Sequence, residues 1–197
     1  MAKILSEKFF NRPALQVAKG LLGKFLVRRL SGKYVALMIA ETEAYIGPQD
    51  RASHASRLWR GSPRAARGRT PRNEPMFGKP GNFYVYFTYG MHWMLNVVTE
   101  REGYPAAVLI RGGIATSNKG QGTTKTIIGG PARLTKFLKI GKRFNGKSAN
   151  RRTGLWFEDR GIKINPHQIK RGKRIGVDYA GKWAKKNYNF RLRMKPD

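Results

Sequence analysis

The sequence predicts an α+β fold: a single compact domain over residues 1–197, with a curved, largely antiparallel sheet, a few helices and a protruding β-hairpin. Strand-like runs dominate the chain, and the regular alternation of strands and helices that marks a parallel sheet is missing. A length of 197 residues allows one domain with a substantial core, and a hydrophobic fraction of 40% indicates a folded protein.

Two segments have the pattern of short helices. Residues 11–23 carry a proline in the first turn, an apolar stripe at helical spacing, and Gly23 where the helix can end. Residues 131–140 repeat this pattern and are followed by Gly141. Both segments are therefore predicted to be helices.

Residues 24–29 and 34–46 are predicted to be strands joined by a turn at Ser31 and Gly32. A regular pleat in the second strand places alternate side chains on one face. That face would hold Val35, Leu37, Ile39, Glu41, Glu43 and Tyr45. Two carboxylates and a tyrosine would then project together, one step beyond the apolar core.

A long excursion and a hairpin follow. Residues 47–81 are rich in arginine and proline, and surface excursions of such length without structure are usually functional or mobile. Residues 82–88 and 91–99 are β-rich runs that predict a hairpin turning at Tyr89 and Gly90. An exposed tyrosine at such a tip is what a wedge inserted into a duplex requires. The alternative is that Tyr89 folds back onto the core.

The last third of the chain is less regular. Residues 105–111 are predicted to form a strand. Residues 112–130 are rich in glycine, threonine and serine, and we expect them to be irregular. Residues 188–193 alternate apolar and polar side chains, which predicts a final strand.

The charge predicts a polyanionic partner. The chain has 40 Lys and Arg against 11 Asp and Glu, a formal net charge of +29. No acidic residue occurs between Asp50 and Glu74 or between Glu102 and Glu158, although many basic residues do. A surface that serves only solubility mixes both signs, and a membrane-binding protein would need a basic amphipathic helix. Nucleic acid is therefore the expected partner.

Several classes of protein are excluded. The chain has no cysteine, which rules out disulfides, thiolate nucleophiles, iron–sulfur clusters and cysteine-based zinc sites. The histidines His54, His92 and His167 lack metal-ligand spacing, so no metal site is expected. No stretch reaches the roughly 18 apolar residues of a membrane span, and charge interrupts the N-terminus too early for a signal peptide. We expect a cytoplasmic, nucleoid-associated protein.

Glu41 and Glu43 stand out because the chain is otherwise poor in carboxylates, which are costly to bury. Paired carboxylates beside aromatic residues suit cleavage of a glycosidic bond through an oxocarbenium-like state. One glutamate would deprotonate water and stabilise the sugar cation, while tyrosines stack on the departing ring. The alternative is a structural ion pair with an arginine.

Residues 141–148 match the phosphate-binding pattern G-x-x-x-x-G-K-[ST]. That pattern has meaning only between a buried strand and a helix. Here a predicted helix precedes it, and the arginine-rich segment that follows is a poor helix start. A nucleotide hydrolase is therefore disfavoured.

Short sequence blocks follow one another in order along nearly the whole chain. They are residues 41–48, His54, 70–73, 76–77, 79–81, 84–86, 89–91, Asn96, 108–111, 130–131, 174–177 and 180–184. This ordered set resembles the alkyladenine (3-methyladenine) DNA glycosylases of the human and bacterial type. No single block is decisive, but the combination is specific.

The resemblance implies a role for each matching residue. Glu43 corresponds to the general base that activates the attacking water, and Arg111 to an arginine that helps to hold that water. Tyr45, His54 and Tyr86 correspond to the pocket that encloses the flipped base.

Further residues face the DNA. Asn96 corresponds to the residue that clashes with the exocyclic amine of normal guanine, and Tyr89 to the wedge. We also expect Arg69, Arg72 and Lys79 to contact the DNA backbone.

The implied activity is that of a monofunctional, metal-free and cofactor-free DNA glycosylase, acting as a monomer on double-stranded DNA. It would flip out and hydrolytically excise damaged purines of the 3-methyladenine, 7-methylguanine, hypoxanthine and ethenoadenine class, leaving an abasic site in base excision repair. A methylated purine is cationic, so it stacks well between tyrosines. The alternatives are a basic nucleic-acid-binding protein without catalysis and a degenerate family member that binds lesions without cutting.

Two segments depart from the family pattern. Residues 55–69 are longer than usual by several residues, which is either an extra loop along the DNA or a tolerated insertion. Residues 112–130 replace an acidic, helix-forming segment. This second departure bears on the pocket rim and the substrate range.

Overall fold

The computed structural model describes residues 2–56, 69–119 and 122–193. Within them the strands are β1 (Lys3–Ile4), β2 (Phe25–Leu30), β3 (Lys33–Tyr45), β4 (Phe83–Thr88), β5 (His92–Thr99), β6 (Ala106–Lys119), β7 (Gly122–Ile128), β8 (Leu155–Asp159), β9 (Ile169–Gly172) and β10 (Asn189–Leu192). The helices are α1 (Glu7–Phe10), α2 (Ala14–Leu21) and α3 (Pro131–Phe137), with 3₁₀ turns η2 (Glu74–Phe77), η3 (Lys142–Phe144), η4 (Pro166–Gln168) and η5 (Asp178–Trp183). The role expected for residues 57–68 along DNA lies outside the described residues.

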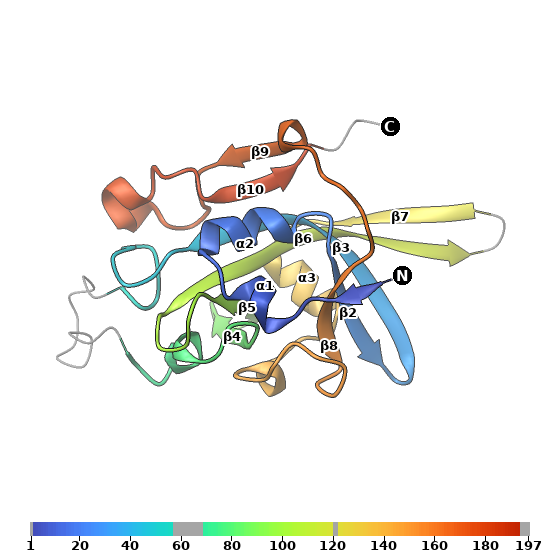
Figure 1. Ribbon diagram of the computed structural model, residues 1–197, viewed down its shortest axis with the longest axis horizontal. Coiled ribbons are helices and arrows are strands. Elements are labelled where there is room, and N and C mark those ends of the chain that lie inside the picture. The colour runs from blue at the N-terminus through green and yellow to red at the C-terminus, as the bar shows by residue number, and fades with distance from the viewer. Residues whose placement is uncertain (1, 57–68, 120–121, 194–197) are drawn as a thin grey trace.

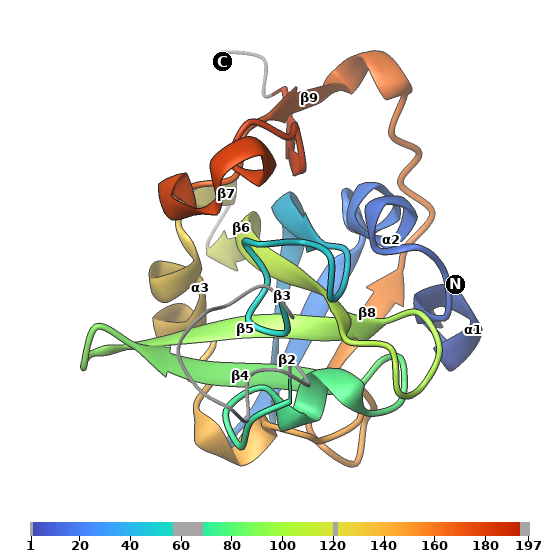
Figure 2. The same cartoon turned by 90° about the vertical axis from the view of Figure 1, so that its left-hand side faces the viewer.

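All described strand pairs are antiparallel and belong to one open sheet, in the order β1-β8-β2-β3-β6-β5-β4. β10 pairs with the end of β3 and with β9, and β7 pairs with β6. Figure 1 shows this arrangement, and in Figure 2 the helices α2 and α3 lie to either side of β3. The α+β prediction with a large antiparallel sheet is confirmed.

The predicted turns form because their residues accept left-handed backbone. Ser31 and Gly32 have φ of 45° and 77° between the paired residues Leu30 and Lys33. Positive φ at both central residues suits the right-handed twist of a hairpin. The hairpin of β4 and β5 likewise turns after Thr88, at residues 89–91.

Residues 112–119 and 122–128 are strands, so the expectation that this segment is irregular was wrong for them. β6 continues to Lys119 and pairs with β7. Gly112 and Gly113 mark close packing inside a strand: a Cβ at Gly112 would lie 2.9 Å from the Ile128 carbonyl oxygen, and one at Gly113 would collide with Leu37 and the Met38 carbonyl. The threonines of β7 then favour extended backbone.

The main core joins α2 to the sheet. Val17, Ala18 and Leu21 on α2 are fully buried in the same apolar cluster as Leu37 and Ile39 of β3. Burial of this face stabilises α2, which at this length would be marginal alone.

The ladder between β3 and β6 is irregular around Glu41. Ile39 pairs with Gly113 and Glu41 with Gly112, but Thr42 already pairs with Ile110. The register therefore shifts on both strands, as in β-bulges. Beyond the shift the core-facing residues are Thr42, whose Oγ1 donates to the Ala18 carbonyl at 2.9 Å, and buried Ala44.

This irregularity corrects the expected pattern of faces. Glu41, Glu43 and Tyr45 do lie together, since Arg111 bridges the two carboxylates and the Tyr45 hydroxyl reaches Glu43. They do not share the face of Leu37 and Ile39. The shift turns them to the side of the sheet away from α2.

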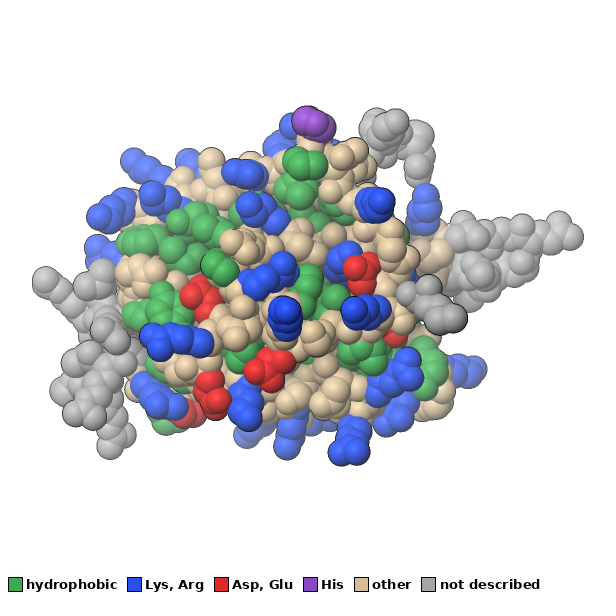
Figure 3. Space-filling view, viewed as in Figure 1, with side chains coloured by type: hydrophobic (Ala, Val, Ile, Leu, Met, Phe, Trp, Pro, Cys, Tyr) green, Lys and Arg blue, Asp and Glu red, His purple; other side chains and the backbone are tan. Residues whose placement is uncertain are grey.

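The described surface is rich in cations. Figure 3 shows lysine and arginine side chains spread over the face that carries α2, with fewer acidic side chains among them. None of the described helices is both long and apolar enough to cross a membrane. The described residues also hold no group of three histidines or carboxylates placed to bind a metal ion.

Candidate active site

A cavity of about 380 Å³ opens between the β4–β5 hairpin, β6, the segment after β3 and residues 175–179. A volume in this range is typical of small-molecule sites. Its lining includes most of the residues proposed from the sequence: Tyr45, His54, Tyr86, Tyr89, Asn96 and Arg111. Residues from five separate segments of the chain thus meet in one place.

The carboxylate of Glu43 lies immediately behind this lining and is fully buried. Its Oε1 accepts hydrogen bonds from the Ile175 amide at 2.9 Å and from Asn189 Nδ2 at 3.1 Å. Its Oε2 accepts one from the Tyr45 hydroxyl at 3.0 Å. These donors satisfy a charge that would otherwise be costly to bury.

Arg111 lies between the two carboxylates. Its Nε is 3.2 Å from Glu41 Oε1 and 3.5 Å from Glu43 Oε1. Asn189 Nδ2 also donates to Glu41 Oε1, at 2.7 Å. The ion pair with an arginine, raised as an alternative from the sequence, therefore exists, and it holds the carboxylates at the cavity wall.

Tyr45 keeps its proton. Burial, and then the negative charge of Glu43, raise the pKa of the Tyr45 hydroxyl well above its ordinary value. A protonated phenol can only donate toward the carboxylate, so the hydrogen bond has one direction. The guanidinium of Arg174 lies 4.8 Å from the centroid of the Tyr45 ring and fixes its position.

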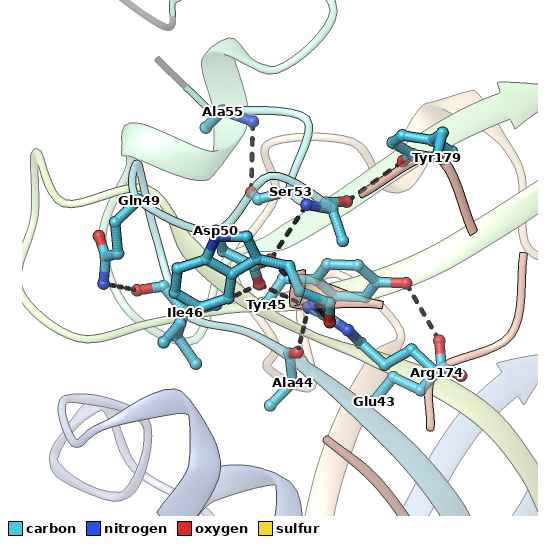
Figure 4. A network of polar contacts seen from close by, with 12 residues as sticks. Glu43, Ala44, Tyr45, Ile46, Gln49, Asp50, Ser53, Ala55, Arg174 and Tyr179 are labelled. Atoms are coloured by element: carbon cyan, nitrogen blue, oxygen red, sulfur yellow. Dashed lines mark hydrogen bonds and ion pairs between the residues drawn. The ribbon is translucent and has the colours of Figure 1, made fainter. Parts of the chain in front are cut away.

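Arg174 and Asp50 form a buried ion pair beneath the site (Figure 4), and both side chains are fully excluded from solvent. Arg174 Nη2 donates to Asp50 Oδ1 at 2.9 Å, and its Nη1 donates to the Ala44 carbonyl at 3.0 Å. This pair anchors residue 174 to the end of β3. It thereby brings the neighbouring Ile175 amide to Glu43.

Aromatic rings form one wall of the cavity. The His54 Nδ1 lies 2.8 Å from the Tyr84 hydroxyl, and the His54 ring centroid is 4.6 Å from that of Tyr86. Desolvation by the surrounding protein, and then the charge of Arg72, lower the pKa of His54 to about 4. The imidazole is therefore neutral at pH 7, and the Asn73 side chain holds the His54 carbonyl at 2.8 Å.

Asn96 lies at the buried end of the cavity. It is 3% exposed, and its Nδ2 donates to the Tyr84 carbonyl at 3.1 Å. Cross-strand pairing with Tyr84 and Leu109 fixes its position on β5. Any group that enters the cavity fully meets this amide.

Tyr89 occupies the tip of the β4–β5 hairpin and does not fold back onto the core. Its side chain is 81% exposed, and it also borders the cavity mouth. Its φ of 52° is left-handed, and Gly90 follows with φ of 65°. The tip therefore presents an aromatic ring to solvent beside the opening.

The three proposed backbone contacts have different surroundings. Arg72 does not line the cavity, but its Cζ lies 5.2 Å from the ring centroid of the lining residue Tyr86. Arg69 forms an exposed ion pair with Glu74, at 2.7 Å. Lys79 is exposed but does not line the cavity.

Sequence reasoning missed Tyr179 and the Asp50–Arg174 pair. Tyr179 lines the cavity, is 61% exposed, and its hydroxyl donates to the Ala52 carbonyl at 3.4 Å. The sequence signal for Tyr179 was its position close to residues 174–177, one of the blocks that match the family pattern. For the ion pair, the signal was an isolated aspartate before a long arginine-rich segment.

The chain is similar to known proteins over almost its whole length. The profile of the methylpurine-DNA glycosylase family matches residues 8–196. A Methanocella arvoryzae protein, named provisionally as a 3-methyladenine DNA glycosylase, is 43% identical over 98% of this chain and 94% of its own length. A Myxococcus xanthus protein with the same provisional name is 41% identical over 96% of this chain and 90% of its own length.

The human protein named DNA-3-methyladenine glycosylase is 35% identical, over 98% of this chain and 66% of its own length. The family match spans almost the whole chain, and each of these relatives is named, provisionally or outright, as a 3-methyladenine DNA glycosylase. The chain belongs to the methylpurine-DNA glycosylase family and is a glycosylase, an enzyme that hydrolyses N-glycosidic bonds.

Proposed function

We propose that this glycosylase flips an alkylated or deaminated purine out of double-stranded DNA and hydrolyses its N-glycosidic bond, leaving an abasic site for base excision repair. One observation carries the proposal: a buried, hydrogen-bonded Glu43 carboxylate directly behind an aromatic cavity in a protein of net charge +29. A purine base has the size and the flat faces that such a cavity accepts.

Glu43 is the proposed general base. Among the described residues, Oε2 accepts a hydrogen bond only from Tyr45, so it keeps a lone pair for a water proton. The water oxygen forms a bond to C1′ of the sugar, its proton passes to Glu43, and the glycosidic electron pair leaves with the base. Arg111 helps to hold the water beside the carboxylate.

The cavity walls select the base. Tyr45, His54 and Tyr86 provide rings that stack on a cationic methylated purine. Because His54 is neutral at pH 7, it adds no positive charge that would repel such a base. Neutral lesions such as hypoxanthine and ethenoadenine depend more on fit and on protonation of the leaving base.

Two further residues would reject undamaged bases and hold a flipped nucleotide out of the duplex. Asn96, at the buried end, would clash with the 2-amino group of normal guanine. Tyr89, exposed beside the opening, would fill the gap left by the flipped nucleotide. Arg72, Lys79 and Arg69 would contact phosphates, and Arg69 would first have to leave Glu74.

The proposed setting follows from the substrate. The protein would act as a monomer, without a metal or a cofactor, on double-stranded DNA in a nucleoid-associated, cytoplasmic location. No lysine occurs among the described residues that line the cavity, which favours direct attack by water over a lysine Schiff base.

The deciding experiment is excision of a single hypoxanthine or 7-methylguanine from a labelled duplex, with alkali to reveal abasic sites. Wild type and Glu43→Gln are compared side by side. We expect alkali-dependent cleavage by wild type and a loss of about 10²–10⁴ in Glu43→Gln, the usual contribution of a general base, with lesion binding retained.

Other outcomes assign the protein differently. Excision by Glu43→Gln at nearly the wild-type rate would overturn the role of Glu43. Tight lesion-selective binding without cleavage by wild type would identify a degenerate lesion reader. Neither cleavage nor selectivity would leave a basic nucleic-acid-binding protein.

A further inference from the structure

A second cavity, of about 490 Å³, lies at the turn between β2 and β3, at the lower right of Figure 1. The β2–β3 turn, η3 and the residues before β8 form its walls. It shares no described lining residue with the active-site cavity. The proposed excision reaction makes no use of it.

Positive charge dominates this cavity. Four of its lining residues are cationic, Arg28, Arg29, Arg143 and Lys147, and none of the described lining residues is acidic. None of the four takes part in an ion pair between described residues. Burial, then the charges of Arg143 and Arg29, lower the pKa of Arg28. These like charges oppose one another without a protein counterion.

Arg28 is held rigidly at the base of the cavity. It is 3% exposed, and its Nη1 donates to the Gly154 carbonyl at 2.9 Å. The Arg28 guanidinium packs closely against the backbone at Gly154, which has φ of 75°. A Cβ at this position would lie only 3.3 Å from Arg28 Nη1, so a glycine suits this contact. The Nε of Arg28 is buried and has no hydrogen-bond partner among the described residues.

Two of the guanidiniums lie against the same aromatic ring, that of Phe144. The Cζ atoms of Arg28 and Arg143 lie 4.8 Å and 4.9 Å from the Phe144 ring centroid. The ring contact restricts both arginine side chains, which lowers the entropy that each loses on binding an anion. The exposed hydroxyl residue Ser31 also lines the cavity and supplies a neutral donor, whereas the Thr153 hydroxyl already donates to Asn150 Oδ1 at 3.2 Å.

Four cations that line one cavity, with no acidic residue among the described lining residues, repel one another, and a bound anion relieves that repulsion. We propose that this cavity binds a phosphate group, either a backbone phosphate of DNA or the phosphate of a free compound. Arginine forks match phosphate oxygens in pairs of hydrogen bonds, and lysine adds a point charge. The segment 141–148 that resembles a nucleotide-binding loop thus contributes Arg143 and Lys147 to an anion site of a different construction.

The test uses the double variant Arg143→Ser/Lys147→Ser, because both residues are exposed and their loss spares the buried Arg28. The matched control is Lys170→Ser/Arg171→Ser, which removes the same two charges from exposed positions on β9. Inorganic phosphate is titrated into each protein by calorimetry at constant ionic strength, set with chloride. We expect phosphate binding by wild type and control, and at least about tenfold weaker binding by the double variant, the effect of losing one charged hydrogen bond.

The affinity for a lesion-free duplex separates the two sources. If DNA supplies the phosphate, the double variant loses affinity relative to the control, and the slope of log K against log salt decreases by about two. If a free compound supplies it, duplex binding matches the control while phosphate binding is lost. The proposal is overturned if the double variant and the control behave alike with both phosphate and duplex. Thermal unfolding of both variants confirms that each is folded.

Discussion

The amide of Ile175 donates a 2.9 Å hydrogen bond to Oε1 of Glu43, and the two residues are separated by 132 positions in sequence. A backbone amide has no rotamers, so the direction of its N–H bond depends on the position of the segment that carries it. That segment is fixed by the neighbouring Arg174, whose guanidinium is paired with Asp50 (Figure 4). The orientation of the proposed base thus depends on an ion pair that does not contact it.

Asp50→Ala should therefore destabilise the fold. The substitution leaves the fully buried Arg174 without its counterion, and breaking a buried pair in this way costs about 3–5 kcal/mol. Urea unfolding followed by circular dichroism measures the change. Glu74→Ala is the control, since its ion pair with Arg69 is exposed and such pairs contribute roughly 0–1 kcal/mol. Equal effects of the two substitutions would contradict the assignment.

Tyr45→Phe should reduce excision without preventing base stacking. The change removes the 3.0 Å hydrogen bond to Glu43 Oε2 but keeps the ring. A hydrogen bond to a charged group contributes about 1.5–3 kcal/mol, so single-turnover excision should slow at least about tenfold. Lesion affinity, measured with Glu43→Gln as background, should change little. A loss of affinity as large as the loss of rate would instead assign Tyr45 to binding.

His54 should make stability depend on pH in a defined window. Its pKa is about 4 in the folded protein against an ordinary value of 6.5, so the unfolded chain binds more protons between these values. The contribution of neutral His54 to the free energy of unfolding is therefore fully present above about pH 6.5 and is lost as the pH falls toward 4. His54→Gln should flatten the free energy of unfolding across this window. His92→Gln, the same substitution at an exposed histidine, is the control, and equal flattening by the two substitutions would contradict the assignment to His54.

Much of the site could be predicted because its residues lie in locally recognisable blocks. Tyr45 and Tyr86 lie in β-rich runs that are recognisable as strands, and Tyr89 and Gly90 form a turn whose chemistry is local. The convergence of these strands around one cavity followed from the resemblance. Periodicity alone could not have given it.

The errors arise where tertiary packing overrides a local rule. Strict alternation along β3 assumes a regular pleat, and the shift at Glu41 depends on how β6 passes it. Gly112 and Gly113 predicted a loop by composition, whereas they permit close contact between neighbouring strands. The pairing of Asp50 with Arg174 spans 124 positions, and no local pattern encodes it.

Tyr89→Ala should weaken capture of a flipped lesion more than it weakens general DNA binding. The ring is 81% exposed at the hairpin tip, so its loss creates no cavity in the core and should not change stability. Stacking of an aromatic side chain on a base contributes about 1–3 kcal/mol, which predicts a loss of roughly 5- to 150-fold in lesion affinity. Affinity is measured by fluorescence anisotropy on duplexes with and without hypoxanthine, in the Glu43→Gln background. Tyr34→Ala, at a 66% exposed tyrosine on β3, is the matched control. An equal loss on lesion and plain duplex would mean that Tyr89 contacts DNA without entering the stack.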